Sequence, residues 1–179
     1  MDYKEKTINS KRVYDGTIIN VCIEDVKLPD GRVAKREIVE HNGGVGVIAL
    51  DEDNCTYMVR QYRVPARDMM LEIPAGKLER GEDPLECGKR ELIEETGYKA
   101  KEFVHLGEYF VTPGYCCERI NIYFARGLEF VGQNLDDGEF VNVEKYHIDD
   151  LYNMVMNNEI YDMKTAIAIL KAKAMVDKT

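Results

Sequence analysis

The segment from Asp83 to Gly97 constrains the fold more than any other part of the chain, because its residues mark both ends of a helix. Asp83 is a good N-cap, Pro84 suits the first helical position, and Glu86 stands three residues after the cap, as in a capping box. Gly97 occupies the place where helices often end in a left-handed residue. The pattern therefore predicts one well-defined helix near the middle of the chain.

One face of this predicted helix is suited to a protein core. It carries small or apolar side chains at helical spacing, at Leu85, Gly88, Leu92 and Thr96. A glycine inside a helix costs up to ~1 kcal/mol relative to alanine, so Gly88 should weaken the helix slightly. We therefore expect the helix to pack along one side of a core.

Another face of the same helix gathers like charges. Glu91, Glu94 and Glu95 occupy neighbouring positions, and a like-charged pair four residues apart costs roughly 0.2–0.5 kcal/mol. Glu82, in the preceding loop, can fold back toward them. One interpretation is a solvated acidic face. The other is an oxygen-only site for Mg²⁺ or Mn²⁺, which is favoured by the glycine-rich loop before the helix and by Arg90 within the run.

Composition limits the partners of the chain. Its 179 residues suffice for one domain with a substantial core, and 45% hydrophobic with 32% charged residues is ordinary for a soluble globular protein. The formal net charge of −9 argues against a nucleic-acid partner, which needs a basic surface. An acidic protein can still bind a phosphorylated small molecule through a metal ion or a few well-placed arginines.

The cysteines and the apolar runs bear on location. Five cysteines, an odd number without a Cys-x-x-Cys pair, argue against a disulfide framework or a zinc site. Free thiols are typical of a reducing cytosol. The first twelve residues are polar and charged, unlike a signal peptide, and no apolar run approaches the ~18 residues that span a bilayer. We therefore expect a soluble, cytoplasmic protein that does not bind membranes.

The remaining pattern predicts strands around the central helix, with further helices at the end. Strands are expected at 16–28 and 32–41, on either side of a Pro-Asp-Gly turn at 29–31. The run 43–50 resembles a buried strand, and 55–62 is interpreted as its neighbour in the sheet. The other expected elements are strands at 71–73, 102–111, 118–126 and 139–146, and helices near 149–157 and 162–176, the latter capped by Asp162. Such an arrangement predicts an α+β sandwich.

The spacing around the acidic helix resembles that of a known family. Gly76, five residues, Glu82, seven residues and then the run 90–98, Arg-Glu-Leu-Ile-Glu-Glu-Thr-Gly-Tyr, are similar to the complete Nudix box at every fixed position. The resemblance extends over nearly the whole chain. It implies an α+β fold, an α/β/α sandwich around a mixed β-sheet, with an N-terminal antiparallel β extension. We expect residues 1–41 to form this extension and residues 42–179 the Nudix hydrolase domain. Members hydrolyse a nucleoside diphosphate linked to another group, with divalent metal.

Features outside the box resemble the ADP-ribose pyrophosphatase branch of that family. Pro113, which lies 15 residues after the box, matches the usual marker of the branch. The other similar segments are REIVEH (36–41), VRQYR (59–63), LEIPAGKLE (71–79), TPGYCCE (112–118) and EIYDMKT (159–165). The resemblance implies hydrolysis of ADP-ribose to AMP and ribose 5-phosphate. Two alternatives remain: a hydrolase of another nucleotide sugar such as GDP-mannose, and a non-catalytic ADP-ribose sensor.

The resemblance also implies roles for residues of the site. The metal ligands, for Mg²⁺ or Mn²⁺, would be Glu91, Glu95 and the backbone carbonyl of Ala75, with Glu94 near a further ion or orienting water. Arg90 and Glu82 would orient the carboxylates and offset their charge. The general base would come from the loop at 135–140, where Glu139 is the first choice. The expected catalytic residues are therefore Glu94, Glu139 and Arg90.

Three more residues match positions that hold the substrate in the family, namely Arg36, Arg63 and Glu118. A guanidinium suits phosphate oxygens or stacking on a base, and a surface salt bridge is the alternative explanation for each arginine. The N-terminal strands resemble the part that family members exchange across a homodimer. We therefore expect a homodimer with a small nucleoside diphosphate as substrate.

Overall fold

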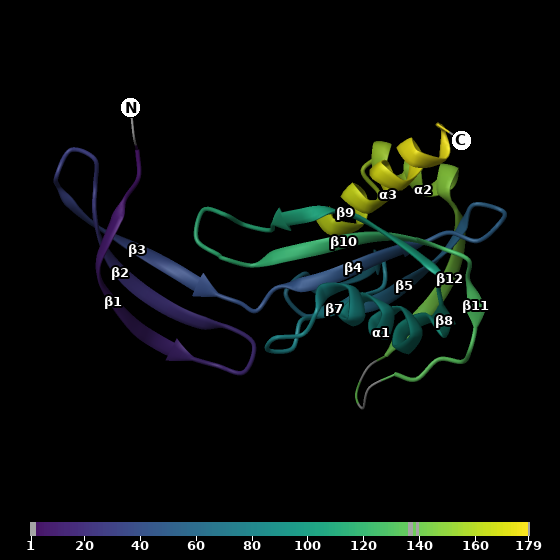
Figure 1. Ribbon diagram of the computed structural model, residues 1–179, viewed down its shortest axis with the longest axis horizontal. Helices are drawn as coiled ribbons and strands as arrows, with labels where there is room; N and C mark the ends of the chain where they lie inside the picture. The colour runs from purple at the N-terminus through teal and green to yellow at the C-terminus, as the bar shows by residue number, and fades with distance from the viewer. Residues whose placement is uncertain (1–2, 136–137, 139, 179) are drawn as a thin grey trace. The chain divides into compact units, whose positions relative to one another are not determined.

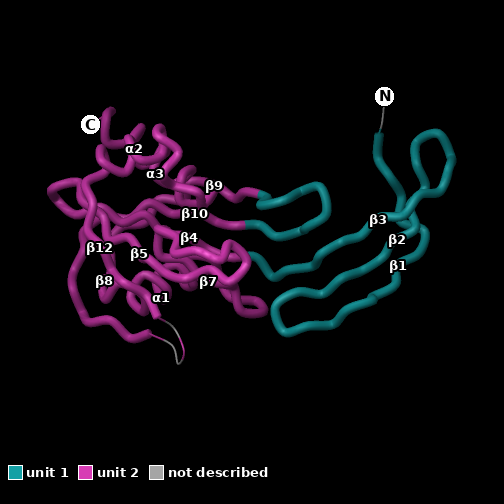
Figure 2. Tube along the Cα trace, turned by 180° about the vertical axis from the view of Figure 1, so that it is seen from behind, with its two compact units in different colours: residues 1–43, 110–119 teal, residues 44–109, 120–179 magenta. Residues whose placement is uncertain are grey.

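The computed structural model describes residues 3–135, 138 and 140–178. The chain divides into two compact units (Figure 2). The first comprises Met1–Gly43 and Phe110–Arg119, and the second comprises Gly44–Tyr109 and Ile120–Thr179.

The first unit contains a three-stranded antiparallel sheet in the order β1 (Lys6–Asp15), β2 (Asn20–Lys27) and β3 (Val33–Glu40) (Figure 1). The turn between β2 and β3 is the predicted one, and Gly31 adopts a φ of 89° there. Strand β1 was not predicted. Every residue of β1 is exposed, so its sequence lacks the alternation of apolar and polar residues that marks a half-buried strand.

The second unit is built on a four-stranded mixed sheet in the order β7-β4-β10-β9. Strand β4 pairs parallel with β10 and antiparallel with β7. A three-stranded antiparallel sheet has the order β12-β5-β6, and a short pair joins β11 to β8. The bounds are β4 (Gly44–Ala49), β5 (Cys55–Arg63), β6 (Asp68–Glu72), β7 (Ala75–Lys77), β8 (Tyr98–Lys99), β9 (Glu102–Phe110), β10 (Arg119–Arg126), β11 (Glu129–Phe130) and β12 (Val141–His147).

The prediction that residues 55–62 form the neighbour of the strand at 43–50 is wrong. Strand β5 pairs with β12 and β6 in the second sheet, and only an isolated bridge between Leu50 and Thr56 connects it with the end of β4. All six residues of β4 are buried, because it lies between β7 and β10, which come from later in the chain. Consecutive strands often pair, but here both edges of β4 are occupied by β7 and β10, so β5 lies in the other sheet.

The described residues form three helices, which begin and end close to where the sequence predicts. They are α1 (Pro84–Thr96), α2 (Ile148–Met156) and α3 (Met163–Val176). The side chain of Asp83 accepts hydrogen bonds from the backbone N–H groups of Leu85 and Glu86. At the other end of α1, Gly97 adopts a left-handed conformation with a φ of 78°. Asp162 caps α3. In the described part of the chain, no helix is both long and apolar enough to cross a bilayer.

The described core has two parts, on opposite faces of β4. Val45, Val47 and Ala49 pack with Leu92 of α1, whereas the alternate β4 residue Ile48 packs with residues of α2 and α3. The cluster on the Ile48 side also includes Leu50, Met58, Ile73, Ile122, Ile148, Leu151 and Ile169. The mixed sheet therefore has helices on both faces, as in the predicted sandwich, and α1 is held against β4.

Candidate active site

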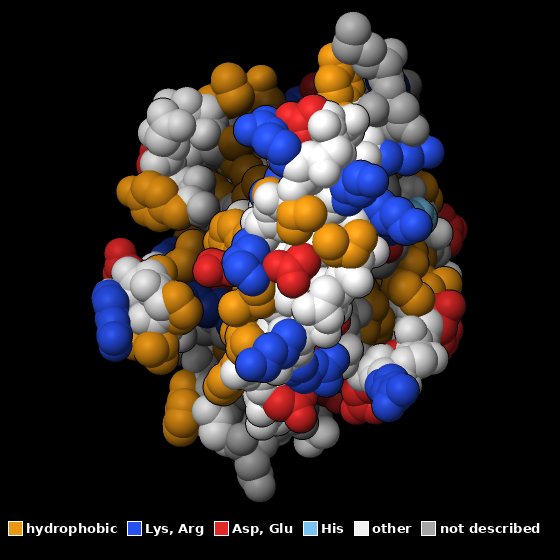
Figure 3. All heavy atoms as spheres, turned by 90° about the vertical axis from the view of Figure 1, so that its left-hand side faces the viewer, with side chains coloured by type: hydrophobic (Ala, Val, Ile, Leu, Met, Phe, Trp, Pro, Cys, Tyr) orange, Lys and Arg blue, Asp and Glu red, His pale blue; other side chains and the backbone are white. Residues whose placement is uncertain are grey.

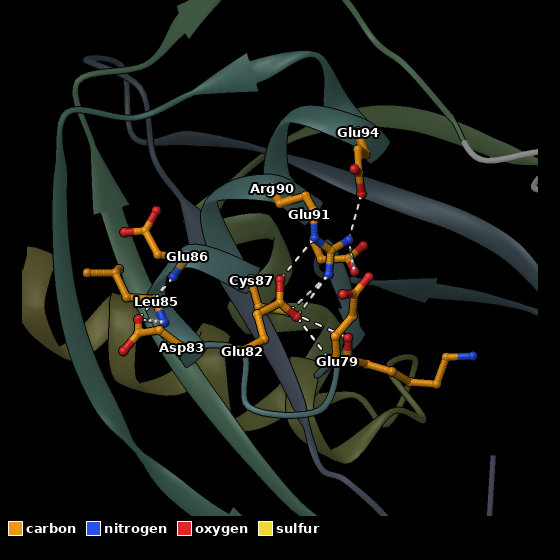
Figure 4. A network of polar contacts seen from close by, with 10 residues as sticks. Glu79, Glu82, Asp83, Leu85, Glu86, Cys87, Arg90, Glu91 and Glu94 are labelled. Atoms are coloured by element: carbon orange, nitrogen blue, oxygen red, sulfur yellow. Dashed lines mark hydrogen bonds and ion pairs between the residues drawn. The ribbon is translucent and has the colours of Figure 1, made fainter. Parts of the chain in front are cut away.

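Helix α1 carries the acidic residues, and a single arginine lies among them (Figure 4). Arg90 Nη1 donates to Glu91 Oε1 at 2.8 Å and to Glu94 Oε2 at 2.9 Å. Its Nε donates to Glu82 Oε1 at 3.1 Å. The structure thus brings the loop carboxylate of Glu82 to the helix, as expected, and the guanidinium offsets the repulsion among three carboxylates.

These contacts change the acidity of both partners. The hydrogen bond from Arg90, followed by that from the Glu79 N–H, holds the pKa of Glu82 below its usual value. Burial would lower the pKa of Arg90, but its hydrogen bond to Glu82 and the charge of Glu91 together raise it above the ordinary value. Glu82 and Arg90 therefore both remain charged across the physiological range of pH.

The short strand β7 lies directly beneath the carboxylate of Glu91. A Cβ on Gly76 would stand 1.7 Å from Glu91 Oε1, so any larger residue here would displace the carboxylate of Glu91. On the neighbouring residue, the Ala75 N–H donates to Glu95 Oε2 at 2.8 Å, and Glu95 is only 4% exposed. The structure thus brings together two carboxylates at the Ala75–Gly76 dipeptide.

The donors at this dipeptide suit a hard divalent cation. They are carboxylate oxygens of Glu91 and Glu95, next to the backbone of Ala75, and oxygen-only sets are what Mg²⁺ and Mn²⁺ prefer. Among the described residues, no group of three or more His, Cys, Asp or Glu side chains is arranged to hold a metal ion as it stands. In this structure Glu91 accepts a hydrogen bond from Arg90, and Glu95 accepts one from the Ala75 N–H.

Arg63, a predicted substrate residue, lies at the end of β5 in a bidentate pair with Glu72. Its Nε and Nη2 donate to the two carboxylate oxygens at 2.7 and 2.8 Å. Burial would raise the pKa of Glu72, but the Arg63 hydrogen bond and the charge of Lys164 lower it below the usual value. Sequence reasoning missed Glu72 and Lys164, although both lie within quoted motifs (71–79 and 159–165), because their pairing spans 92 positions.

The other two predicted substrate residues belong to the first unit. Arg36, on β3, forms a bidentate ion pair with Glu5, in which its Nε donates to Glu5 Oε2 at 2.9 Å. Glu118 Oε1 lies 3.4 Å from His41 Nδ1. The predicted general base, Glu139, lies outside the described residues.

Comparison with protein-family models identifies the family. The NUDIX domain model matches residues 40–165, which span the acidic helix, β7 and all the core strands of the second unit. The chain belongs to the Nudix hydrolase family. Nudix hydrolases generally use divalent metals, in agreement with the oxygen donors at Ala75–Gly76. A second model, the nucleoside diphosphate sugar hydrolase N-terminal domain, matches residues 5–39.

Individual relatives cover nearly the whole of this Nudix protein. The ADP-ribose pyrophosphatase of Bacillus subtilis (strain 168) is 41% identical over 93% of the chain and 91% of its own length. A methanol dehydrogenase activator from Bacillus methanolicus is also 41% identical, with the same coverage of both chains. The crystal structure of an ADP compounds hydrolase, at 19% identity, superposes with a TM-score of 0.85 over 98% of this chain and 95% of that chain. The predicted α+β fold, a mixed sheet with an antiparallel N-terminal extension, is therefore confirmed.

Proposed function

We propose that this protein hydrolyses the diphosphate bond of ADP-ribose, giving AMP and ribose 5-phosphate, with Mg²⁺ as its natural ion and Mn²⁺ as a substitute. The observation that carries the proposal is the position of Glu91 over Gly76 beside the contact between Glu95 and Ala75. The similarity to a protein named ADP-ribose pyrophosphatase, over most of both chains, supports the choice of substrate.

Three groups would hold the ion, namely the carboxylates of Glu91 and Glu95 and the backbone carbonyl of Ala75. A divalent ion there would offset the charge of the substrate diphosphate and favour ionisation of the attacking water. Arg90 holds Glu91 and Glu94 close together before substrate arrives, at 2.8 and 2.9 Å from one of its nitrogens. Glu94 would then orient the attacking water.

We assign the proton acceptor to Glu139, which would take a proton from water as it attacks phosphorus in line. Binding of the nucleotide is assigned to Arg36, Arg63 and Glu118. The guanidinium of Arg63 supports this role, since its side chain is 40% exposed and carries donors beyond those used by Glu72.

We also propose that residues 1–41 are a dimerisation element and that residues 42–179 form the catalytic domain. Strand β1 exposes large hydrophobic side chains, namely Ile8 (53%), Val13 (49%) and Tyr14 (55%). In Figure 3, hydrophobic side chains lie at the surface among lysines, arginines and acidic residues. Burial of such residues in a homodimer would remove them from water. A cytoplasmic location accords with the absence of disulfides, since all five cysteines are free.

A second substrate has specific support. The match of residues 5–39 to a nucleoside diphosphate sugar hydrolase domain is compatible with GDP-mannose or a similar compound. A non-catalytic ADP-ribose sensor is less well supported, because Glu82, Glu91, Glu94 and Glu95 are all retained.

A substrate panel tests the proposal. Phosphate release would be measured, with Mg²⁺ and a coupling phosphatase, from ADP-ribose, GDP-mannose, ADP-glucose, NADH and 8-oxo-dGTP, using Glu95→Gln as the control. We expect ADP-ribose to be turned over fastest and the variant to be inactive. Faster turnover of another nucleotide sugar would support metal-dependent diphosphate hydrolysis but reject ADP-ribose as the preferred substrate. Tight binding of ADP-ribose without turnover of any compound would indicate the sensor.

A further inference from the structure

Glu72 is a buried carboxylate with no role in the mechanism above. It ends β6, three residues before Ala75, and is only 2% exposed. A buried charge is costly unless it is paired and fully hydrogen-bonded. Glu72 meets this requirement with two cations, since Arg63 donates to both of its oxygens and Lys164 donates to Oε2. Glu72 therefore combines deep burial with contacts to two cationic side chains.

The pair is not the one that the strand register would produce. In the β5–β6 ladder Arg63 stands opposite Asp68, an exposed carboxylate, whereas Glu72 stands opposite Val59. The side chain of Arg63 therefore turns back along β5, away from its register partner, to reach Glu72. A half-buried arginine with a carboxylate directly opposite would be expected to pair with that carboxylate, so its turn toward Glu72 indicates that Glu72 orients it.

Helix α3 holds Glu72 from the other side. Lys164, whose side chain is 13% exposed, also donates to the N-cap residue Asp162 at 2.9 Å. In the same turn, Thr165 Oγ1 accepts the Ile73 N–H at 3.0 Å. The carboxylate of Glu72 and the following peptide group are thus both attached to the first turn of α3, so neither can shift without disturbing a helix terminus.

The N–H groups of Arg63 that do not contact Glu72 are available to bind a ligand. A guanidinium has five N–H donors, and Glu72 takes two of them, which leaves three for another ligand. The nearby charges that act on Arg63 include that of Glu95, one of the two carboxylates at Ala75–Gly76. A bidentate anchor on one edge leaves the opposite edge in a fixed orientation, which suits a diphosphate.

We propose that Glu72 is a positioning residue, which fixes the guanidinium of Arg63 so that its remaining N–H groups bind the diphosphate of the substrate. The inference rests on the proposed function and extends it to a residue that does not itself touch substrate. Lys164 acts through Glu72, because it fixes that carboxylate to α3.

A double-mutant cycle on the full-length protein tests the inference. The variants are Glu72→Gln, Arg63→Gln and the combination, with Asp68→Asn as the matched control on the same strand. Binding of the ADP-ribose analogue with a methylene bridge in place of the diphosphate oxygen would be measured by calorimetry, alongside KM and kcat for ADP-ribose. Circular dichroism would establish that each variant is folded. Should Glu72→Gln not fold, Glu72→Asp retains the charge while moving the carboxylate back by one methylene.

We expect Glu72→Gln and Arg63→Gln each to weaken analogue binding about tenfold, with KM rising similarly and kcat nearly unchanged. The double variant should bind no more weakly than Arg63→Gln alone, because Glu72 acts only through Arg63. Asp68→Asn should match the unmodified protein. Glu72→Asp should weaken binding by a similar factor.

Two results would overturn the inference while leaving the proposed function intact. One is unchanged binding in folded Glu72→Gln or Glu72→Asp, with ADP-ribose still hydrolysed by the unmodified protein. The other is an additive loss in the double variant, which would show that Glu72 affects binding independently of Arg63 and does not act by positioning it. Failure of the unmodified protein to bind the analogue or hydrolyse ADP-ribose would instead reject the proposed function, and the inference with it.

Discussion

At the scale of single residues, the site depends on which atoms stand next to the carboxylates of α1. Arg90 donates to Glu91 and Glu94 of the helix and to Glu82 of the preceding loop. Gly76 leaves room for one of these carboxylates, that of Glu91, against the β7 backbone. A side chain of any size at position 76 would displace that carboxylate. The glycine of the motif is thus explained by a close approach and not by an unusual backbone conformation, since its φ is not positive.

Gly76→Ala should therefore impair the site with little effect on the fold. The new methyl group would collide with Glu91, so we expect kcat/KM to fall by about 100-fold, roughly 2.7 kcal/mol of transition-state stabilisation. The concentration of Mg²⁺ that gives half-maximal activity should rise. Kinetics at varied Mg²⁺ would measure both. Gly114→Ala is the control, because no atom lies within 4 Å of a Cβ there, and its Mg²⁺ requirement should be unchanged. An unchanged requirement in Gly76→Ala would contradict the prediction.

The buried pair of Glu72 predicts how stability depends on pH. The pKa of Glu72 is lowered in the folded protein, so its contribution is complete above the unfolded value of about 4.3 and is lost as pH falls through the lower folded value. Breaking a buried pair costs roughly 3–5 kcal/mol, and the partial exposure of Arg63 reduces this to about 2–3 kcal/mol for Glu72→Gln at pH 7.

Urea unfolding between pH 7 and pH 3 measures this dependence. The difference between the unmodified protein and Glu72→Gln should be constant above pH ~4.5 and should shrink below it. Glu102→Gln, at an exposed position of β9, provides the control. A difference that stayed constant down to pH ~3 would show that the Glu72 carboxylate is not the source of the stabilisation.

At the scale of elements, the packing of α1 on β4 explains a glycine that helix propensity alone disfavours. A Cβ on Gly88 would lie 3.0 Å from Val45 Cγ1 and 3.1 Å from Val47 Cγ2. Both valines are fully buried or nearly so, and β-branched side chains have little freedom to move aside. The glycine therefore allows α1 to approach the strand that also supports β7.

Gly88→Ala should consequently not produce the gain of ~1 kcal/mol that alanine gives in an unconstrained helix. We expect the free energy of unfolding to be lower by about 1 kcal/mol, since overpacking outweighs propensity. Thermal unfolding measures this, and Val47→Ala in the Gly88→Ala background should recover part of the loss by making room. A stabilised Gly88→Ala variant would show that the contact between helix and strand is looser than the structure indicates.

At the scale of the whole molecule, the prediction concerns association of two copies. Two bulges in β1 fall between Thr7 and Asn9 and between Arg12 and Tyr14, so the exposed residues Ile8 and Val13 occupy the extra positions. The double variant Ile8→Asp/Val13→Asp should convert the proposed dimer to a monomer, because two charges would be buried at the interface.

Sedimentation velocity would measure the oligomeric state. Met156→Asp, an exposed hydrophobic residue of α2 in the second unit, provides the matched control and should remain dimeric. A monomeric unmodified protein, or a dimer that survives both aspartates, would remove residues 1–41 from the proposed interface.

Local chemistry in the sequence was sufficient to predict α1 with both caps, the Gly31 turn, the α3 cap and the family, because each depends on residues close together in the chain. Strand β1 and the pairing of β5 with β12 could not be predicted. The first lacks a buried face, and the second depends on pairing with residues some 80 positions away, such as Glu144 opposite Met58.

The same division applies to the site. The sequence by itself determined which carboxylates share a helix face and which glycine precedes them, since helical spacing places side chains three and four residues apart side by side. Only the tertiary structure decided that Glu91 lies over Gly76, that Glu95 meets Ala75, and that Glu72 anchors Arg63 to α3. These contacts join separate elements, and their geometry is set by how β6, β7, α1 and α3 pack around one core.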